Sequence, residues 1–136
     1  MSETVIHMIG HAGTDVDYRQ VGNGTDLSTF RLASTPRRYD RNSDQYVDGT
    51  TTWITVQCWR SLALHVRDAV RRGDPLVVIG KLRTEEWTKD DQRYSRMVLE
   101  ALALGHDLNR GVSTFRKTQR HTETRDEPAP ASAQTS

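Results

Sequence analysis

The clearest hydrophobic pattern in the chain is the alternation of residues 51–60. Ile54, Val56 and Cys58 are apolar and occupy every second position, so in a strand they point to one face and suit a protein core. The residues of the opposite face are Trp53, Thr55, Gln57 and Trp59. Two indoles with polar residues between them are untypical of a core and of a plain solvent face. We therefore interpret this face as a surface for binding flat aromatic groups.

Similar short patterns divide the rest of the first hundred residues. Four further strands are predicted at residues 4–14, 26–38, 75–89 and 93–104, and a short strand at 16–21 would continue the first of them. A turn is predicted at Gly22-Asn23-Gly24, and a long exposed hairpin loop at residues 37–49.

One segment has helical spacing. Between residues 60 and 72 the apolar residues recur three and four positions apart, at Leu62, Val66, Ala69 and Val70. Ser61 is the expected N-cap, and Gly73 is expected to end the helix.

The resulting order, β-β-β-α-β-β, predicts the fold class. Short strands with one helix between the third and fourth favour an all-β, five-stranded barrel of the oligonucleotide/oligosaccharide-binding (OB) type. The apolar pattern stops near residue 107, and residues 123–136 are rich in Thr, Pro, Ala and Ser. We expect an OB-fold domain at residues 1–108 and a disordered tail at residues 109–136.

Composition excludes several classes of protein. A chain of 136 residues suits one domain, and it has no apolar run long enough to span a membrane and no secretion signal at its N-terminus. The single cysteine excludes an intrachain disulfide, so a reducing cytoplasm is expected. The net charge of +1 does not by itself indicate a nucleic-acid-binding protein. A positive surface would have to come from the local placement of charges.

Motifs for catalysis and for metal binding are missing from the sequence. His7 and His11 share one face of the first predicted strand, but no third ligand stands at a suitable spacing, which favours a structural role for both. We find no nucleophile–base pair and no glycine-rich phosphate loop. We therefore expect no enzyme activity, no metal and no cofactor.

Several stretches stand in a fixed order along residues 3–106. They are Ile9-Gly10, Phe30 to Arg37 (FRLASTPR), Trp53 to Val56 (WITV) with Trp59-Arg60, Arg72 to Leu82 (RGDPLVVIGKL) and Leu82 to Trp87 (LRTEEW). In this order and spacing the chain resembles the bacterial single-stranded DNA-binding protein family, and closely its actinobacterial branch. The resemblance implies the barrel predicted above, assembly as a homotetramer, and coating of single-stranded DNA during replication, recombination and repair, in the cytoplasm at the nucleoid.

The resemblance also assigns roles to individual residues. The family's base-stacking aromatics correspond to Trp53, Trp59 and Trp87, and its loop aromatic to Tyr39; position 59 is often phenylalanine in the family, and tryptophan keeps the π-face. Stacking accepts any base and contributes roughly 1–3 kcal/mol per base, so it predicts binding without sequence preference. The cations expected at the phosphates are Arg37, Arg38, Arg60, Lys81, Arg83, Lys89 and Arg96.

Two other functions remain open at this point. The barrel could be a protein-interaction module of a replication or primosome complex with weak nucleic-acid affinity, its tryptophans forming an interface. It could also bind RNA, because stacking does not distinguish ribose from deoxyribose. Many family members end in an acidic tip with a terminal hydrophobic residue that recruits partner proteins, whereas residues 125–136 have neither. We therefore expect a secondary paralogue that coats DNA without this recruitment.

Overall fold

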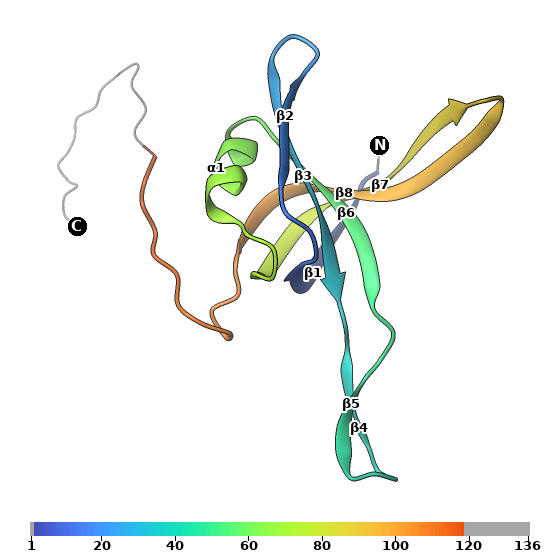
Figure 1. Ribbon diagram of the computed structural model, residues 1–136, viewed down its shortest axis with the longest axis vertical. Coiled ribbons are helices and arrows are strands. Elements are labelled where there is room, and N and C mark those ends of the chain that lie inside the picture. The colour runs from blue at the N-terminus through green and yellow to red at the C-terminus, as the bar shows by residue number, and fades with distance from the viewer. Residues whose placement is uncertain (1, 119–136) are drawn as a thin grey trace.

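A closed ring of five strands forms the centre of the molecule. The computed structural model of the protein describes residues 2–118. Its elements are β1 (Thr4–Ala12), β2 (Asp17–Val21), β3 (Thr25–Ser34), β4 (Arg37–Asp40), β5 (Gln45–Asp48), β6 (Thr52–Trp59), α1 (Ser61–Ala69), β7 (Pro75–Lys89) and β8 (Gln92–His106). The ring runs in the order β1-β7-β8-β6-β3 and returns to β1, and β2 is added to it beside β3 (Figure 1). The predicted five-stranded OB-fold barrel, with one helix between its third and fourth strands, is confirmed.

The ring closes where β1 changes its partner. Most of β1 pairs with β7, but at its end His11 and Ala12 pair with Ala33 and Leu32 of β3. Gly10 lies just before this point, and a Cβ atom placed on it would be 2.3 Å from the carbonyl oxygen of Ala33. Only glycine permits this close approach of two backbones.

The core has the composition that alternation predicts. Ile54, Val56 and Cys58 of β6 are buried, as are Phe30 of β3 and Leu99 of β8. Burial raises the pKa of the Cys58 thiol to about 12, because a thiolate loses solvation in an apolar environment. The prediction that Cys58 faces the protein core is therefore confirmed.

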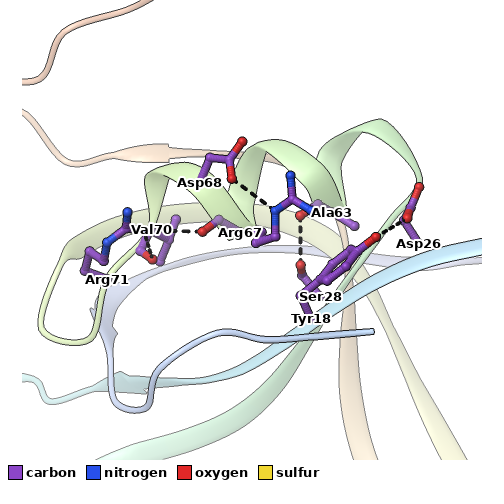
Figure 2. Close-up of polar contacts among 8 residues, drawn as sticks. All are labelled: Tyr18, Asp26, Ser28, Ala63, Arg67, Asp68, Val70 and Arg71. Atoms are coloured by element: carbon purple, nitrogen blue, oxygen red, sulfur yellow. Dashed lines mark hydrogen bonds and ion pairs between the residues drawn. The ribbon is translucent and has the colours of Figure 1, made fainter. Parts of the chain in front are cut away.

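Helix α1 covers one end of the barrel and is attached to β3 by a buried hydrogen bond. The Ser28 hydroxyl, which is fully buried, donates to the Ala63 carbonyl at 2.8 Å (Figure 2). Nearby, the Tyr18 hydroxyl donates to Asp26, and the guanidinium carbon of Arg67 lies 4.7 Å from the Tyr18 ring centroid. These contacts join the β2–β3 hairpin to the helix.

The ends of the helix differ from the predicted ones. Ser61 is the first helical residue, and the N-cap position belongs to Arg60, whose side chain makes no capping hydrogen bond and whose φ is 59°. The Arg60 amide instead donates to the Asp26 carbonyl at 3.0 Å, so a tertiary contact fixes the start of the helix. The helix ends at Ala69, earlier than expected, and the turn that follows contains Gly73 at φ 93°.

Residues 37–49 were predicted to be a loop, and this prediction is wrong because most of them form two paired strands. The predicted strand at 26–38 ends at Ser34, and a separate two-stranded ribbon, β4–β5, follows it. In this ribbon Tyr39 pairs with Tyr46, and their rings meet edge to face at 5.5 Å. The ribbon extends away from the barrel (Figure 1), so the expectation that these residues are exposed holds.

The chain leaves the barrel after β8. Residues 109–118, which belong to the predicted tail, form no helix or strand, and two of their side chains lie within hydrogen-bond distance of histidines of the domain. Ser113 is 2.8 Å from a ring nitrogen of His106, and Thr118 is 2.6 Å from one of His65. Residues 119–136, the remaining part of the predicted tail, lie outside the described residues, and so does the stretch 125–136 to which the expectation about the acidic tip refers. Over the described part of the chain, no helix is long and apolar enough to cross a membrane.

Candidate nucleic-acid interface

Strand register places five of the eleven predicted site residues on one outer face of the barrel. On β6, Trp53 and Trp59 lie at the two ends of this face, with Thr55 and Gln57 between them. The neighbouring strands add Arg31 of β3, opposite Thr55, and Glu100 of β8, opposite Gln57. Arg83, Glu85 and Arg96 continue the same face along β7 and β8. We call these nine residues, together with Trp87 and Tyr94 farther along the same two strands, the aromatic face.

The middle of the aromatic face is not the open strip that alternation suggests. Thr55 and Gln57 are only 8% and 5% exposed. Arg83 donates to the side-chain oxygen Oε1 of Gln57 at 2.8 Å, and the side-chain nitrogen Nε2 of Gln57 donates to Glu85 at 3.3 Å. Two side chains of β7 therefore contact Gln57, and the middle of the predicted binding face is closed by polar side chains.

This coverage is part of a chain of polar contacts across three strands. From one end to the other it runs Glu100, Arg83, Gln57, Glu85, Arg96. Arg83 is 3.3 Å from Glu100, and Arg96 is 2.8 Å from Glu85. Partial burial alone would raise the pKa of Glu85, but hydrogen bonds from Arg96 and Gln57 outweigh it, and the pKa is lowered. Glu85 is therefore ionised at neutral pH and is the ion-pair partner of Arg96.

Trp53 lies at one end of the aromatic face with a cation beside it. The guanidinium carbon of Arg31 is 5.1 Å from the ring centroid, a distance typical of cation–π contact. The indole also lies over Gly13, where a Cβ atom would be 2.4 Å from a ring carbon. Trp53 is nevertheless 48% exposed. Arg31 was not among the predicted site residues, although its place between the core residues Phe30 and Leu32 indicates that it points to the outer face.

Trp59 lies at the other end of the aromatic face in a shallow pocket. The pocket has a volume of about 360 Å³, and Trp59 lines it together with Arg60, Arg83 and Glu100, while the β2–β3 turn supplies its outer wall. Trp59 is less exposed than Trp53 and Trp87. Arg60, a predicted phosphate ligand, is exposed at the rim of this pocket.

Trp87 is carried beyond the barrel by the β7–β8 hairpin, which extends outward at residues 84–97 (Figure 1). It is 43% exposed and stacks on Tyr94, with ring centroids 5.7 Å apart and planes 19° apart. Arg96 lies 5.7 Å from the Trp87 ring centroid. Tyr94 was not among the predicted residues, although a short turn between the predicted strands at 75–89 and 93–104 brings it close to Trp87; in the structure the two residues are directly opposite each other.

The remaining predicted residues lie around the aromatic face. Tyr39, 47% exposed, is on the β4–β5 ribbon with Arg37 and Arg38. Arg37 is 3.7 Å from Asp48, and its guanidinium carbon is 5.8 Å from the ring centroid of Tyr46, a second aromatic that we did not predict. Lys89 is exposed at the tip of the β7–β8 hairpin. Lys81 of β7 is directly opposite Glu100 of β8, next to the aromatic face, and it pairs with Glu3 at 3.3 Å.

Residues 2–118 contain no group of three or more His, Cys, Asp or Glu side chains that could hold a metal ion. The only ionisable side chains joined on the aromatic face are the Arg–Glu pairs described above. The face therefore presents planar aromatic groups and paired charges.

The barrel and its aromatic face together define an OB-fold protein of the kind that binds oligonucleotides or oligosaccharides. Comparison with known proteins narrows this class. The profile of the Single-strand binding protein family matches residues 3–105, and the chain belongs to that family.

Named relatives agree with this assignment. The chain is 38% identical over 117 residues to "Single-stranded DNA-binding protein 2" of Streptomyces avermitilis, which covers 86% of this chain and 73% of the relative. It is 36% identical over 130 residues to "Single-stranded DNA-binding protein 1" of Streptomyces coelicolor, covering 96% of this chain and 83% of the relative.

Solved structures are also similar. A crystal structure of the small single-stranded DNA-binding protein from Streptomyces coelicolor superimposes with a TM-score of 0.71 at 36% identity, over 82% of this chain and 100% of that one. The second single-stranded DNA-binding protein from Mycobacterium smegmatis gives a TM-score of 0.66 at 30% identity, over 85% and 100%. The resemblance to the actinobacterial branch of the family is thereby confirmed.

Proposed function

We propose that this chain binds and protects single-stranded DNA without regard to sequence, in replication, recombination and repair, in the cytoplasm at the nucleoid. The observation that carries the proposal is the placement of Trp53 and Trp87, both exposed and each with an arginine over its ring, on one continuous face. Exposed indoles offer stacking surfaces to unpaired bases of any identity. Family membership and the names of the relatives support DNA as the ligand.

Under this proposal the site has three parts. Trp53 and Trp87 stack on bases, and Trp59 takes a further base in its pocket. Tyr39 on the β4–β5 ribbon extends the stacking surface, with Tyr46 and Tyr94 as supporting aromatics. The phosphates between the bases are neutralised by exposed cations around the face, which are Arg31, Arg37, Arg38, Arg60 and Lys89. We place Lys81 at the edge of this site because it already pairs with Glu3.

The first test is a titration with oligo-dT. Intrinsic tryptophan fluorescence is expected to fall as bases stack on the exposed indoles, and the affinity is expected to fall with rising salt because binding releases counterions from the DNA. A matched oligo-U of equal length measures the preference for DNA over RNA. Unchanged fluorescence and no retention of oligo-dT at low salt would refute the proposal.

The protein-interaction module is the weaker explanation of the same face. In that reading the tryptophans are buried in an interface and nucleic-acid affinity is weak, and neither the family nor the relatives' names favour it. The protein-interaction explanation would be favoured if the chain formed a stable complex with another protein through Trp53 and Trp87 and did not bind oligo-dT.

We also infer that the chain assembles with copies of itself, as a homotetramer. Val5 and Ile9 of β1 are 49% and 61% exposed on the outer side of the barrel, and Leu102 of β8 is 54% exposed. Within residues 2–118 the second edge of β1 is paired only at His11 and Ala12, so its earlier residues have free backbone groups. An exposed apolar strand with a free edge is suited to pairing with another chain.

Replacing Ile9 by glutamate is expected to reduce the assembled mass. The substitution places a charge on the exposed apolar side of β1, where a second copy would have to desolvate it. Light scattering of the wild type and of Ile9→Glu measures the effect, with Asn23→Glu as a control that adds the same charge at the exposed β2–β3 turn. Equal masses for the wild type and Ile9→Glu would contradict an interface at β1.

A further inference from the structure

The aromatic face contains two carboxylates, Glu85 and Glu100, although the proposed ligand is a polyanion. Both are on the same face as the tryptophans, because Glu85 is two residues from Trp87 on β7 and Glu100 is opposite Gln57 on β8. Their side chains are about one-third exposed, at 32% and 33%, so solvent and a bound strand can reach them. A phosphate placed beside an unpaired carboxylate would be repelled.

Each carboxylate has its own arginine partner. Arg96 donates to Glu85 from Nε at 2.9 Å, and its Nη2 is 2.8 Å from the same oxygen. Arg83 donates from Nε to Glu100 at 3.3 Å and from Nη2 to Gln57 at 2.8 Å. Gln57 is buried and joins the two pairs, because its amide donates to Glu85 while its oxygen accepts from Arg83. The pairs therefore act as one connected structure.

We propose that Glu85 and Glu100 act as positioning residues that keep Arg96 and Arg83 from serving as phosphate ligands, and so limit the salt dependence of DNA binding. This inference rests on the proposed function. N–H groups of a guanidinium lie in its plane, so an arginine held by its edge keeps its flat faces for stacking on bases. Arg96 is already beside the Trp87 ring. The two arginines thus contribute planar surface, and the cations at the edges of the site neutralise the phosphates.

The physical consequence concerns the slope of affinity against salt. For a single strand, each neutralised phosphate contributes about 0.7 to the slope of log K against log salt. An arginine already paired with a carboxylate adds little to this slope, and its carboxylate opposes a nearby phosphate. The low pKa of Glu85 keeps this carboxylate charged at the pH of the measurement. Removing the charge should free one arginine for one more phosphate.

The test replaces one carboxylate by its neutral isostere. Glu85→Gln is expected to bind oligo-dT about three- to tenfold tighter at low salt, because it removes a like charge and frees Arg96. Its log K should fall more steeply with salt, by about 0.7 in slope. Glu100→Gln, which frees Arg83 at the other end of the polar chain, is expected to behave in the same way and provides an independent second variant. Both are measured by anisotropy of labelled oligo-dT over a range of salt concentrations.

Glu86→Gln is the matched control. Glu86 directly precedes Trp87 in the sequence. Its side chain is 65% exposed, and its ion-pair contact is long, with 3.9 Å between its carboxylate and Arg93. This variant makes the same charge change without freeing an arginine of the aromatic face, and its slope should equal that of the wild type. Thermal unfolding of all three variants reports whether the fold is kept.

The outcomes separate this inference from the proposed function. Suppose that the wild type binds oligo-dT, and that Glu85→Gln and Glu100→Gln have the same affinity and salt slope as the wild type or as the control Glu86→Gln. The inference is then overturned, and the proposed function stands. Weaker binding by either folded variant also overturns the inference, because the carboxylate would then be a direct contact to the bases. A wild type that does not bind overturns both.

Discussion

Replacing Trp87 or Trp53 by alanine is expected to weaken the binding of oligo-dT by about five- to 150-fold each, as the roughly 1–3 kcal/mol of one stacked base converts. The two sites are on different strands, so the double variant should lose more than either single one. Trp53 has an additional reason to matter, because its removal leaves Arg31 without the ring beside it. Anisotropy of labelled oligo-dT measures the loss, since the substitutions also change the intrinsic fluorescence.

Two control variants test whether the loss of affinity comes from the aromatic rings of this face. Trp87→Phe keeps a π-face and should retain most of the affinity. Phe115→Ala removes an aromatic side chain that is 87% exposed but belongs to the segment after β8 rather than to the aromatic face. Its affinity should equal that of the wild type. If Trp53→Ala and Trp87→Ala both bind as tightly as the wild type, the stacking surface lies elsewhere.

Gly10→Ala is expected to cause the largest loss of stability for the smallest change of side chain. The new Cβ would lie 2.3 Å from the Ala33 oxygen and 2.9 Å from its carbon, and both are backbone atoms that cannot rotate away. Relief requires β1 and β3 to separate at the pairs that close the barrel. Overpacking of this kind typically costs about 1–3 kcal/mol, occasionally more. For a domain of this size the midpoint of thermal unfolding should fall by roughly 4–20 °C.

Gly105→Ala is the matched control for this substitution. Gly105 is also in a strand of the barrel, but a Cβ atom there would meet no atom within 4 Å. Alanine should leave the melting temperature near that of the wild type or raise it slightly, because it reduces the freedom of the unfolded chain. Equal melting temperatures for the two variants would show that the contact at Gly10 can relax.

Strand alternation was sufficient to predict the strands of the barrel, the core residues of β6 and the outward position of Trp53. Ile54, Val56 and Cys58 are core residues, and Trp53 is exposed on the opposite face, because the side-chain period of a strand is local. Tyr94 was within reach of the same reasoning, since its position opposite Trp87 needs only a count across a short turn.

The features that sequence could not predict depend on contacts between distant segments. Gln57 has a polar side chain on the outer face, and it is buried only because Arg83, 26 residues away, lies over it. Arg60 adopts φ 59° at the helix start because its amide meets the carbonyl of Asp26. Neither partner is indicated by the local pattern. The β4–β5 ribbon was missed for a different reason, because its polar residues lack the alternation that a half-buried strand shows.

The burial of Cys58 gives the chain an internal measure of its own opening. It is the only cysteine in the sequence, it is fully buried in β6, and the raised pKa of its thiol leaves almost no thiolate at neutral pH. A thiol reagent can therefore react only when the barrel opens around β6. A ligand that binds the native state lowers the population of that opened form. The rate of Cys58 labelling, with and without DNA, thus measures how much DNA bound at the aromatic face stabilises β6 against opening.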